Sequence, residues 1–331
     1  MRPAVLILLG AAGACAAPAR EDISLRGLCA AGHEVAWASG SVGTILRTVD
    51  GGGTWLPVAP PPGAETRDFR DVHAFDARRA LLMAAGPGAE SGVWLTATGG
   101  ESWEKVLDCP WPEGFFDGIA FWDERAGLLV GDPVAGALLV LHTADGGRLW
   151  TRAAALPATI PGEYAFAASG TSVCVQPGGR AWIGTGGAAA RVWRSGDFGL
   201  TWSAVAAPLA QGAESAGVFS ICFADARHGV IVGGDYLQPE AREETAAWTA
   251  DGGATWTPSA VPPGGFRSCA SACGGGVFLC TGPSGTDVSR DGGRTWEPLR
   301  DARSAPLPGF HAVDGRFAAG SGGRAATIPR P

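Results

Sequence analysis

The sequence contains no asparagine, and Lys105 is its only lysine. Because N-glycosylation needs an asparagine acceptor, the chain has no site for that modification. Acidic residues outnumber basic residues by 32 to 25, and lysine and arginine form no run. Proteins that bind nucleic acid neutralise phosphates with clustered cations, so this composition predicts no nucleic-acid partner.

Short motifs of several enzyme classes are also missing. The chain has no G-x-S-x-G, Walker loop or H-E-x-x-H segment, which excludes the commonest hydrolase, nucleotide-binding and zinc-protease assignments. The segment GTGGAA at 184–189 matches G-x-G-x-x-A. A dinucleotide fingerprint continues into a helix, however, and the following ARVWRS predicts a strand, so we expect no cofactor.

The cysteines do not form the pattern of a metal site. No two have C-x-x-C spacing and no histidine lies in a zinc-like register with them, so we expect no metal. The favoured interpretation is small, buried residues on strands. Cys269 and Cys280 flank a glycine turn at 274–276, and a hairpin there would set them opposite each other. In an exported protein this pair is a candidate disulfide.

Glycine and proline are abundant and indicate the fold class. The chain has 52 glycines and 24 prolines among 331 residues, roughly twice the usual share. So many turn-forming residues exclude a mostly helical protein. The hydrophobic content of 46% is that of an ordinary globular chain, so we expect a packed, strand-rich fold.

The first residues have the pattern of a secretory signal. Arg2 precedes an apolar stretch at 4–14 and small residues up to position 17, which predicts a signal peptide over residues 1–17. Cys15 follows AGA, which resembles a bacterial lipoprotein cleavage site. We therefore expect export to the periplasm or cell envelope, either with a lipid anchor at Cys15 as the one membrane contact or as a soluble secreted protein.

One eight-residue motif, S/T-x-D-x-G-x-T-W, recurs six times, at 48–55, 96–103, 143–150, 195–202, 249–256 and 289–296. It predicts a tight turn in which the carboxylate accepts backbone N–H groups, glycine takes positive φ, and tryptophan packs between neighbouring sheets. The structural residues of the motif are Asp50, Asp145, Asp197, Asp251, Asp291, Trp55, Trp103, Trp150, Trp202, Trp256 and Trp296.

Each motif closes a unit of four short strand-like segments, and such units recur every 40–54 residues between the closing tryptophans. A four-stranded unit of this length is a propeller blade. The tail at 309–329 repeats three of the strands without the motif. We therefore predict an all-β, monomeric, seven-bladed β-propeller of four-stranded antiparallel blades over residues 21–331, with the last blade closed by a strand around 21–25.

The motif is that of the Asp-box, or bacterial neuraminidase repeat. Its presence in nearly every blade of an exported chain resembles the photosystem II stability and assembly factor-like family, over residues 25–325. The resemblance implies a non-enzymatic protein with a role in assembly. Asp-boxes also occur in sialidases and sortilin-like receptors, so the motif is specific for fold and not for function.

A ligand site is expected on the face opposite the Asp-boxes, where inner strands begin and second strands end. The sequence places acidic and aromatic residues there, which predicts a mouth that binds a protein segment or a small ligand. The competing interpretation is that they are solvated loop residues or turn caps. The candidates are Asp117, Asp132, Glu163, Asp235, Tyr236, Arg267 and Ser284.

A sialidase-like glycan hydrolase is the alternative function. It requires a tyrosine nucleophile paired with a glutamate, a carboxylate acid/base and an arginine cluster. Tyr236 with Glu163, and Asp117 or Asp132, are candidates for the first two roles. Arg26, Arg70 and Arg267 are candidates for the third, although the chain lacks the F/Y-R-I-P segment typical of sialidases.

Overall fold

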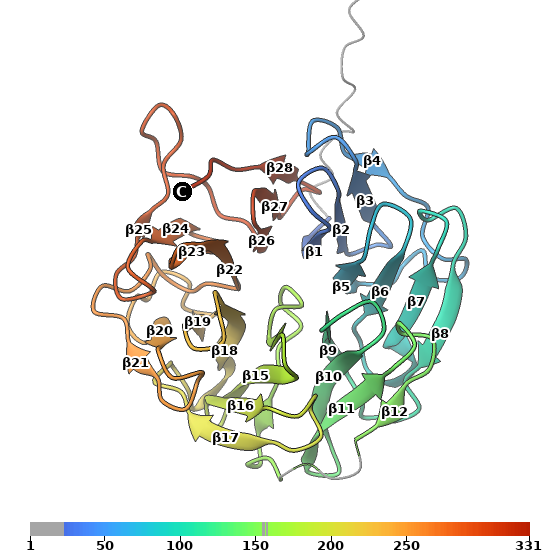
Figure 1. Ribbon diagram of the computed structural model, residues 1–331, viewed down its shortest axis with the longest axis horizontal. Helices are drawn as coiled ribbons and strands as arrows, with labels where there is room; N and C mark the ends of the chain where they lie inside the picture. The colour runs from blue at the N-terminus through green and yellow to red at the C-terminus, as the bar shows by residue number, and fades with distance from the viewer. Residues whose placement is uncertain (1–22, 154–155, 157) are drawn as a thin grey trace, which may run out of the picture.

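Short runs of apolar residues between glycine-rich turns form 28 strands arranged around a ring (Figure 1). The computed structural model describes residues 23–153, 156 and 158–331, and its only helical element there is a 3-10 turn at Gly88–Glu90. None of the described helical structure has the length and apolarity needed to cross a membrane. The signal-like residues and Cys15 lie outside the described residues. The all-β propeller prediction is confirmed.

In the first three blades the strands pair antiparallel in chain order. Blade one contains β1 (Leu25–Ala30), β2 (Ala36–Gly40), β3 (Ile45–Thr48) and β4 (Leu56–Pro57). Blade two contains β5 (Phe69–Ala74), β6 (Ala80–Ala84), β7 (Gly92–Thr96) and β8 (Glu104–Asp108). Blade three contains β9 (Phe116–Phe121), β10 (Gly127–Val134), β11 (Ala137–Thr143) and β12 (Thr151–Arg152).

Blades four and five are joined at one edge by β15–β18 pairing, and a short β13 (Glu163–Tyr164) also pairs with β15. Blade four contains β14 (Val173–Gln176), β15 (Arg180–Gly187), β16 (Arg191–Ser195) and β17 (Ser203–Ala206). Blade five contains β18 (Ala213–Phe223), β19 (Gly229–Asp235), β20 (Ala246–Thr249) and β21 (Thr257–Pro258). Blade six contains β22 (Cys269–Gly274), β23 (Val277–Gly282), β24 (Gly285–Ser289) and β25 (Glu297–Pro298).

The seventh blade differs from the prediction. Its sheet has three described strands, β26 (Ala312–Asp314), β27 (Phe317–Ala319) and β28 (Ala325–Thr327). The expected fourth strand around 21–25 is not formed by its described part, in which Ser24 makes only an isolated antiparallel bridge to Ser321 and Leu25 begins the innermost strand of blade one. This segment still joins the two ends of the ring, because Leu25 N donates to Gly320 O at 3.1 Å.

Six tryptophans of the repeat fill the spaces between blades. Each belongs to a hydrophobic cluster that contains residues of its own blade and of the preceding one, and the cluster of Trp55 also includes residues of blade six. For example, Trp256 packs with Trp182 and Phe223, and its ring centroid lies 6.0 Å from that of Phe223. In order from the interface of blades one and two to that of blades seven and one, they are Trp103, Trp150, Trp202, Trp256, Trp296 and Trp55.

The turn of blade five shows the bonding of the motif. The Thr255 backbone N–H donates to Asp251 Oδ1 at 3.0 Å and its hydroxyl donates to Oδ2 at 2.6 Å, while Gly253 N donates to Thr249 Oγ1 at 3.0 Å. These bonds, the Thr255 hydroxyl first, lower the pKa of Asp251 to about 2. In blade two, Thr98 replaces the carboxylate and accepts from Ser102 N at 2.9 Å.

The cysteines are all free thiols in the described part of the chain. The candidate disulfide between Cys269 and Cys280 is wrong, because the register pairs Cys269 with Thr281 and Ala270 with Cys280. Neighbouring positions along a strand face opposite sides of the sheet. Cys269 accordingly packs in the cluster towards blade seven and Cys280 in the cluster towards blade five.

We expect Asp251→Ala to lower the free energy of unfolding by about 1 kcal/mol near neutral pH, since it removes bonds to a largely exposed carboxylate. The folded pKa lies below the unfolded value, so the carboxylate stabilises the fold above about pH 4 and this contribution is lost as the pH falls towards 2. Urea denaturation at neutral pH and near pH 2.5 measures the difference. It should shrink in acid, and Glu243→Ala, at an exposed position, serves as the control.

Alkylation in denaturant without reductant, followed by intact-mass measurement, tests the thiols. Cys29, Cys109, Cys174, Cys222, Cys269, Cys273 and Cys280 should all be modified. Protection of Cys269 and Cys280 that reductant reverses would contradict the observed register.

Candidate functional site

A cavity of about 400 Å³ lies over the ring at the face where the inner strands begin, and every blade contributes to it. The first blades provide Arg26, Arg70, Asp117 and Asp132, and the segment 165–168 follows from blade four. The later part of the ring provides, among others, Glu214, Phe219, Tyr236, Phe266 and His311.

Four of these side chains occupy equivalent positions. The antiparallel register shifts at Arg26, Arg70, Asp117 and Phe219, each near the start of an inner strand or, for Phe219, at its cavity end. A bulge of this kind leaves one residue unpaired and re-aims its side chain. In these four blades the repeat therefore supplies a position that faces the cavity, and it is filled by two arginines, an aspartate and a phenylalanine.

One wall of the cavity is aromatic. Phe166 and Phe219 stack with ring centroids 3.8 Å apart, and Phe266 meets Phe219 edge to face at 4.7 Å. Tyr236 lies 6.1 Å from Phe219 and is 49% exposed. This wall is preformed and suits an apolar or aromatic group of a ligand.

A pair of carboxyl groups lies in the same cavity. Asp117 is 1% exposed, receives no hydrogen bond from any described residue, and leaves its buried Oδ2 without a partner. Asp132 accepts from Ala165 N at 3.1 Å. Burial and then the charge of Asp132 raise the pKa of Asp117 well above its ordinary value, and burial raises that of Asp132 to about 6.

The basic groups differ in their freedom to bind a ligand. Arg70 donates its Nε to Asp68 at 2.7 Å and its Nη1 to Ala167 O at 3.3 Å. Arg26 has no hydrogen-bond partner among the described residues, and burial together with the Arg70 charge lowers its pKa. His311 lies 2.9 Å from Ser321 Oγ, and burial lowers its pKa to about 4, so it is neutral at physiological pH.

Glu163 lies outside this cavity. Its carboxylate accepts from Thr185 Oγ1 at 2.6 Å, Trp193 Nε1 at 3.0 Å and Arg191 Nε at 3.0 Å. Burial acts to raise the pKa of Glu163, but the bonds from Arg191 and Thr185 outweigh it and hold the pKa below its ordinary value. The structure gives Glu163 a structural role within blade four in place of the predicted ligand contact.

Arg267 and Ser284 also lie outside the cavity lining. Arg267 is 1% exposed, and its Nε donates to Asp287 Oδ2 at 2.7 Å while its Nη1 donates to Ser284 Oγ at 2.9 Å. The guanidinium thus ties the strands of blade six together. The adjacent Phe266 lines the cavity instead, because neighbouring residues of an extended chain point to opposite sides.

Asp235 lies at the rim without lining the cavity. Its Oδ1 accepts from Leu237 N at 2.9 Å and its Oδ2 from Gln238 Nε2 at 3.1 Å, which is the bonding of a turn cap. Of the seven predicted ligand residues, the structure thus brings together Asp117, Asp132 and Tyr236. The predicted ligand set did not include Phe166, Phe219, Phe266 and Glu214. The register shift that turns Phe219 towards the cavity has no sequence signature.

The sialidase alternative is not supported by this arrangement. A tyrosine nucleophile needs a paired glutamate, but the Glu163 carboxylate is fully engaged within blade four. Tyr236 contacts Phe219 and Phe266 instead. The described contacts of Tyr236 and of Glu163 thus do not include each other, and Arg267 is paired with Asp287.

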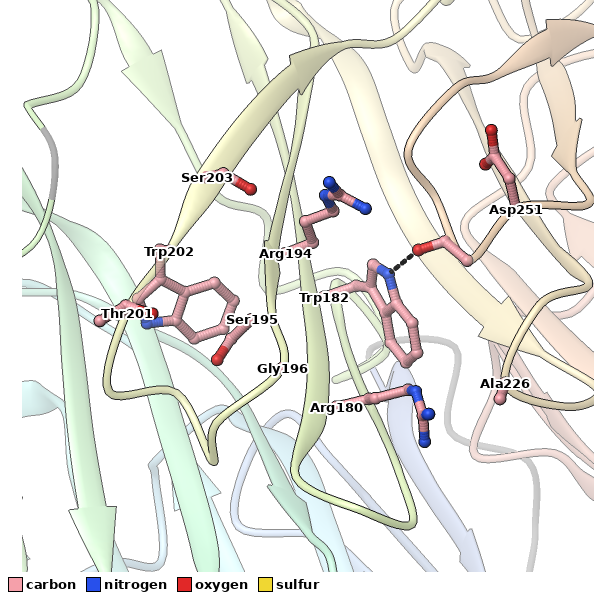
Figure 2. A pocket seen from close by; sticks show the side chains of 11 residues that line it. Arg180, Trp182, Arg194, Ser195, Gly196, Thr201, Trp202, Ser203, Ala226 and Asp251 are labelled. Atoms are coloured by element: carbon pink, nitrogen blue, oxygen red, sulfur yellow. Dashed lines mark hydrogen bonds between the residues drawn. The ribbon is translucent and has the colours of Figure 1, made fainter.

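A second cavity, of about 450 Å³, lies between the turns of blades four and five on the opposite face (Figure 2). Figure 2 shows Arg180, Trp182 and Arg194 extending from β15 and β16, and the Trp182 Nε1 bond to Gly252 O at 2.9 Å. A similar groove of about 270 Å³ occurs between blades two and three. Since a groove of this kind occurs between the turns of two different pairs of blades, we attribute it to the repeat and take the first cavity as the candidate site.

No group of three or more histidine, cysteine, aspartate or glutamate residues in the described part of the chain is arranged to hold a metal ion. The glycine-rich 184–187 segment belongs to β15 and the chain continues into the strand β16, so no helix follows it.

The cavity offers a ligand an aromatic surface, carboxyl groups and the guanidinium of Arg26, which has no partner among the described residues.

Comparisons with known proteins identify the fold. No protein-family model and no curated protein matches the sequence. Among solved structures, one described as "YCF48 bound to D1 peptide" has a TM-score of 0.65 at 15% identity, covering 94% of this chain and 95% of that chain. YCF48 from Cyanidioschyzon merolae has a TM-score of 0.61 at 18% identity, covering 94% and 97%.

Propellers of other families are similar at lower identity. The WD40 propeller of Doa1 has a TM-score of 0.60 at 11% identity, covering 95% of both chains. An ancestral GH74 enzyme has a TM-score of 0.55 at 13% identity, and the match covers 86% of this chain and 40% of that chain. Because one fold hosts many functions, these similarities show that this chain is a β-propeller and show nothing about its ligand.

Proposed function

We propose that this protein is an exported, non-enzymatic propeller that docks a protein segment or a small ligand in the cavity over its ring and so aids the assembly or stability of an envelope complex. The observation that carries the proposal is the cavity itself, in which an aromatic wall adjoins carboxyl and guanidinium groups. A preformed apolar surface with a few convergent polar groups is the usual composition of a binding site.

The size of the cavity limits what enters it. Its volume of about 400 Å³ lies near the lower end of ligand pockets, which span about 300–1,000 Å³. We therefore infer that a bound segment inserts a few side chains and lies mostly across the rim. The lining comes largely from strand ends of a rigid ring, so little ordering of the protein accompanies binding.

The similar fold of YCF48, solved with a D1 peptide, supports segment binding as a use of this architecture. The repeat resemblance to assembly factors supports the same class of function. We therefore propose that this chain also binds a protein segment. The chemistry of that segment is inferred from the residues that line the cavity.

The place of action follows from the first residues of the sequence. The signal pattern over 1–17 supports export, and Cys15 supports a lipid tether, with cleavage near position 17 as the alternative. We propose that the propeller acts as a monomer in the periplasm or envelope.

The binding prediction uses peptides selected from a displayed random library on the wild-type protein, measured by fluorescence anisotropy. Tyr236→Ala should weaken their binding at least about tenfold, because exposed aromatic anchors carry a large share of interface energy. Leu237→Ala is the matched control, since Leu237 is 72% exposed and does not line the cavity. Peptides that bind Tyr236→Ala as well as the wild type would contradict a site in this cavity.

A further inference from the structure

The unpaired carboxyl of Asp117 is a feature of the cavity that the fold does not account for. Buried polar groups in native structures nearly always have a hydrogen-bond partner, and those without one require an explanation. Asp117 is buried and lines the cavity, yet no described residue donates to it. Its two neighbours of similar chemistry, Asp71 and Asp132, both accept backbone N–H groups, from Ile119 at 2.7 Å and Ala165 at 3.1 Å.

The charges around Asp117 favour a cation. Asp132 and Arg70 are the charged groups that act on it, and Arg70 is already paired with Asp68. The other titratable groups of the cavity are Arg26, Glu214, Tyr236 and His311. Of these, His311 is neutral, so three carboxyl groups line the cavity against Arg26, the one guanidinium there without a carboxylate partner among the described residues.

The geometry also distinguishes among cations. Asp117 has no hydrogen-bond partner at either oxygen among the described residues, and Asp132 has only Oδ1 engaged by Ala165 N, so the oxygens left for a ligand are divided between two carboxyl groups. A guanidinium is a planar fork that prefers both oxygens of one carboxylate, whereas an ammonium is a point charge with three separate donors on a slender apolar stem. The phenylalanine wall in the same cavity suits such a stem.

We propose that the Asp117–Asp132 end of the cavity binds the ammonium group of a lysine side chain carried by the docked protein segment. The proposal rests on the proposed function and names the chemistry of the segment. Burial raises the pKa of both carboxyl groups, and an ammonium beside them favours their ionised forms, so we expect its arrival to release a proton to solvent.

The test uses three blocked dipeptides, Ac-Phe-Lys-NH2, Ac-Phe-norleucine-NH2 and Ac-Phe-Glu-NH2, titrated calorimetrically near pH 6.5. The lysine peptide should bind at least about tenfold more tightly than the norleucine peptide. Its apparent heat should differ between phosphate and imidazole buffers by the amount that proton release predicts. Asp117→Asn should remove both the preference and the buffer dependence.

Asp235→Asn is the matched control, because it removes an equal charge from a carboxylate at the same rim that caps a turn and does not line the cavity. It should keep the preference for lysine. Folding of Asp117→Asn is checked by thermal denaturation: a raised folded pKa means that ionisation of Asp117 costs stability above about pH 4, so the variant should melt higher than the wild type at pH 8 and equally at pH 4.

The outcomes separate the two proposals. Equal binding of the lysine and norleucine peptides, tighter binding of the glutamate peptide, or full binding by a folded Asp117→Asn overturns the lysine site. If library peptides still depend on Tyr236, the segment-docking function stands without it. Loss of that dependence overturns both.

Discussion

The contact between each turn glycine and the blade before it is the constraint on which the ring depends. At Gly253, with φ of 78°, an added Cβ would lie 2.9 Å from Trp182 Nε1. At Gly147 it would lie 2.7 Å from Leu81, and at Gly293 it would lie 2.4 Å from Val230. Glycine is thus required twice, for its backbone conformation and for the closeness of the neighbouring blade. The tryptophan that follows then fills the rest of the interface.

Because the turn glycines and the tryptophans hold the blades together, the face that carries the cavity contributes less to the fold. The turns, with their carboxylates and tryptophans, stabilise the face opposite the cavity and the contacts between blades. Residues at the start of the inner strands are therefore less constrained by the fold. In four blades the shifted register at this position turns one side chain towards the cavity, and guanidinium groups, a carboxyl and a phenyl ring occupy the same structural place in different blades. The buried carboxyl at Asp117 opposes stability, which is typical of positions retained for binding.

The fold was predictable from sequence because the same turn motif, with the same requirements on its backbone and packing, occurs six times. Hairpin glycines, capping carboxylates and interface tryptophans are local or nearest-neighbour features. The site was predictable only as a region. The correct loops were identified, but Arg267 and Glu163 carry partners from their own blades, and Phe266 faces the cavity where its neighbour does not. Such choices depend on which strand lies alongside, and that is tertiary information. The predicted disulfide was wrong for a similar reason. A shift of one residue in the strand register places a cysteine on the opposite face of the sheet.

The closure of the ring places the N-terminal segment beside the cavity. Ile23 O accepts from Gly322 N at 2.7 Å, and Arg26, three residues later, lines the cavity. The chain therefore enters the ring beside the mouth of the cavity and not on the side of the turns. A ligand that contacts Arg26 would therefore lie against the junction at which the two ends of the described ring are joined.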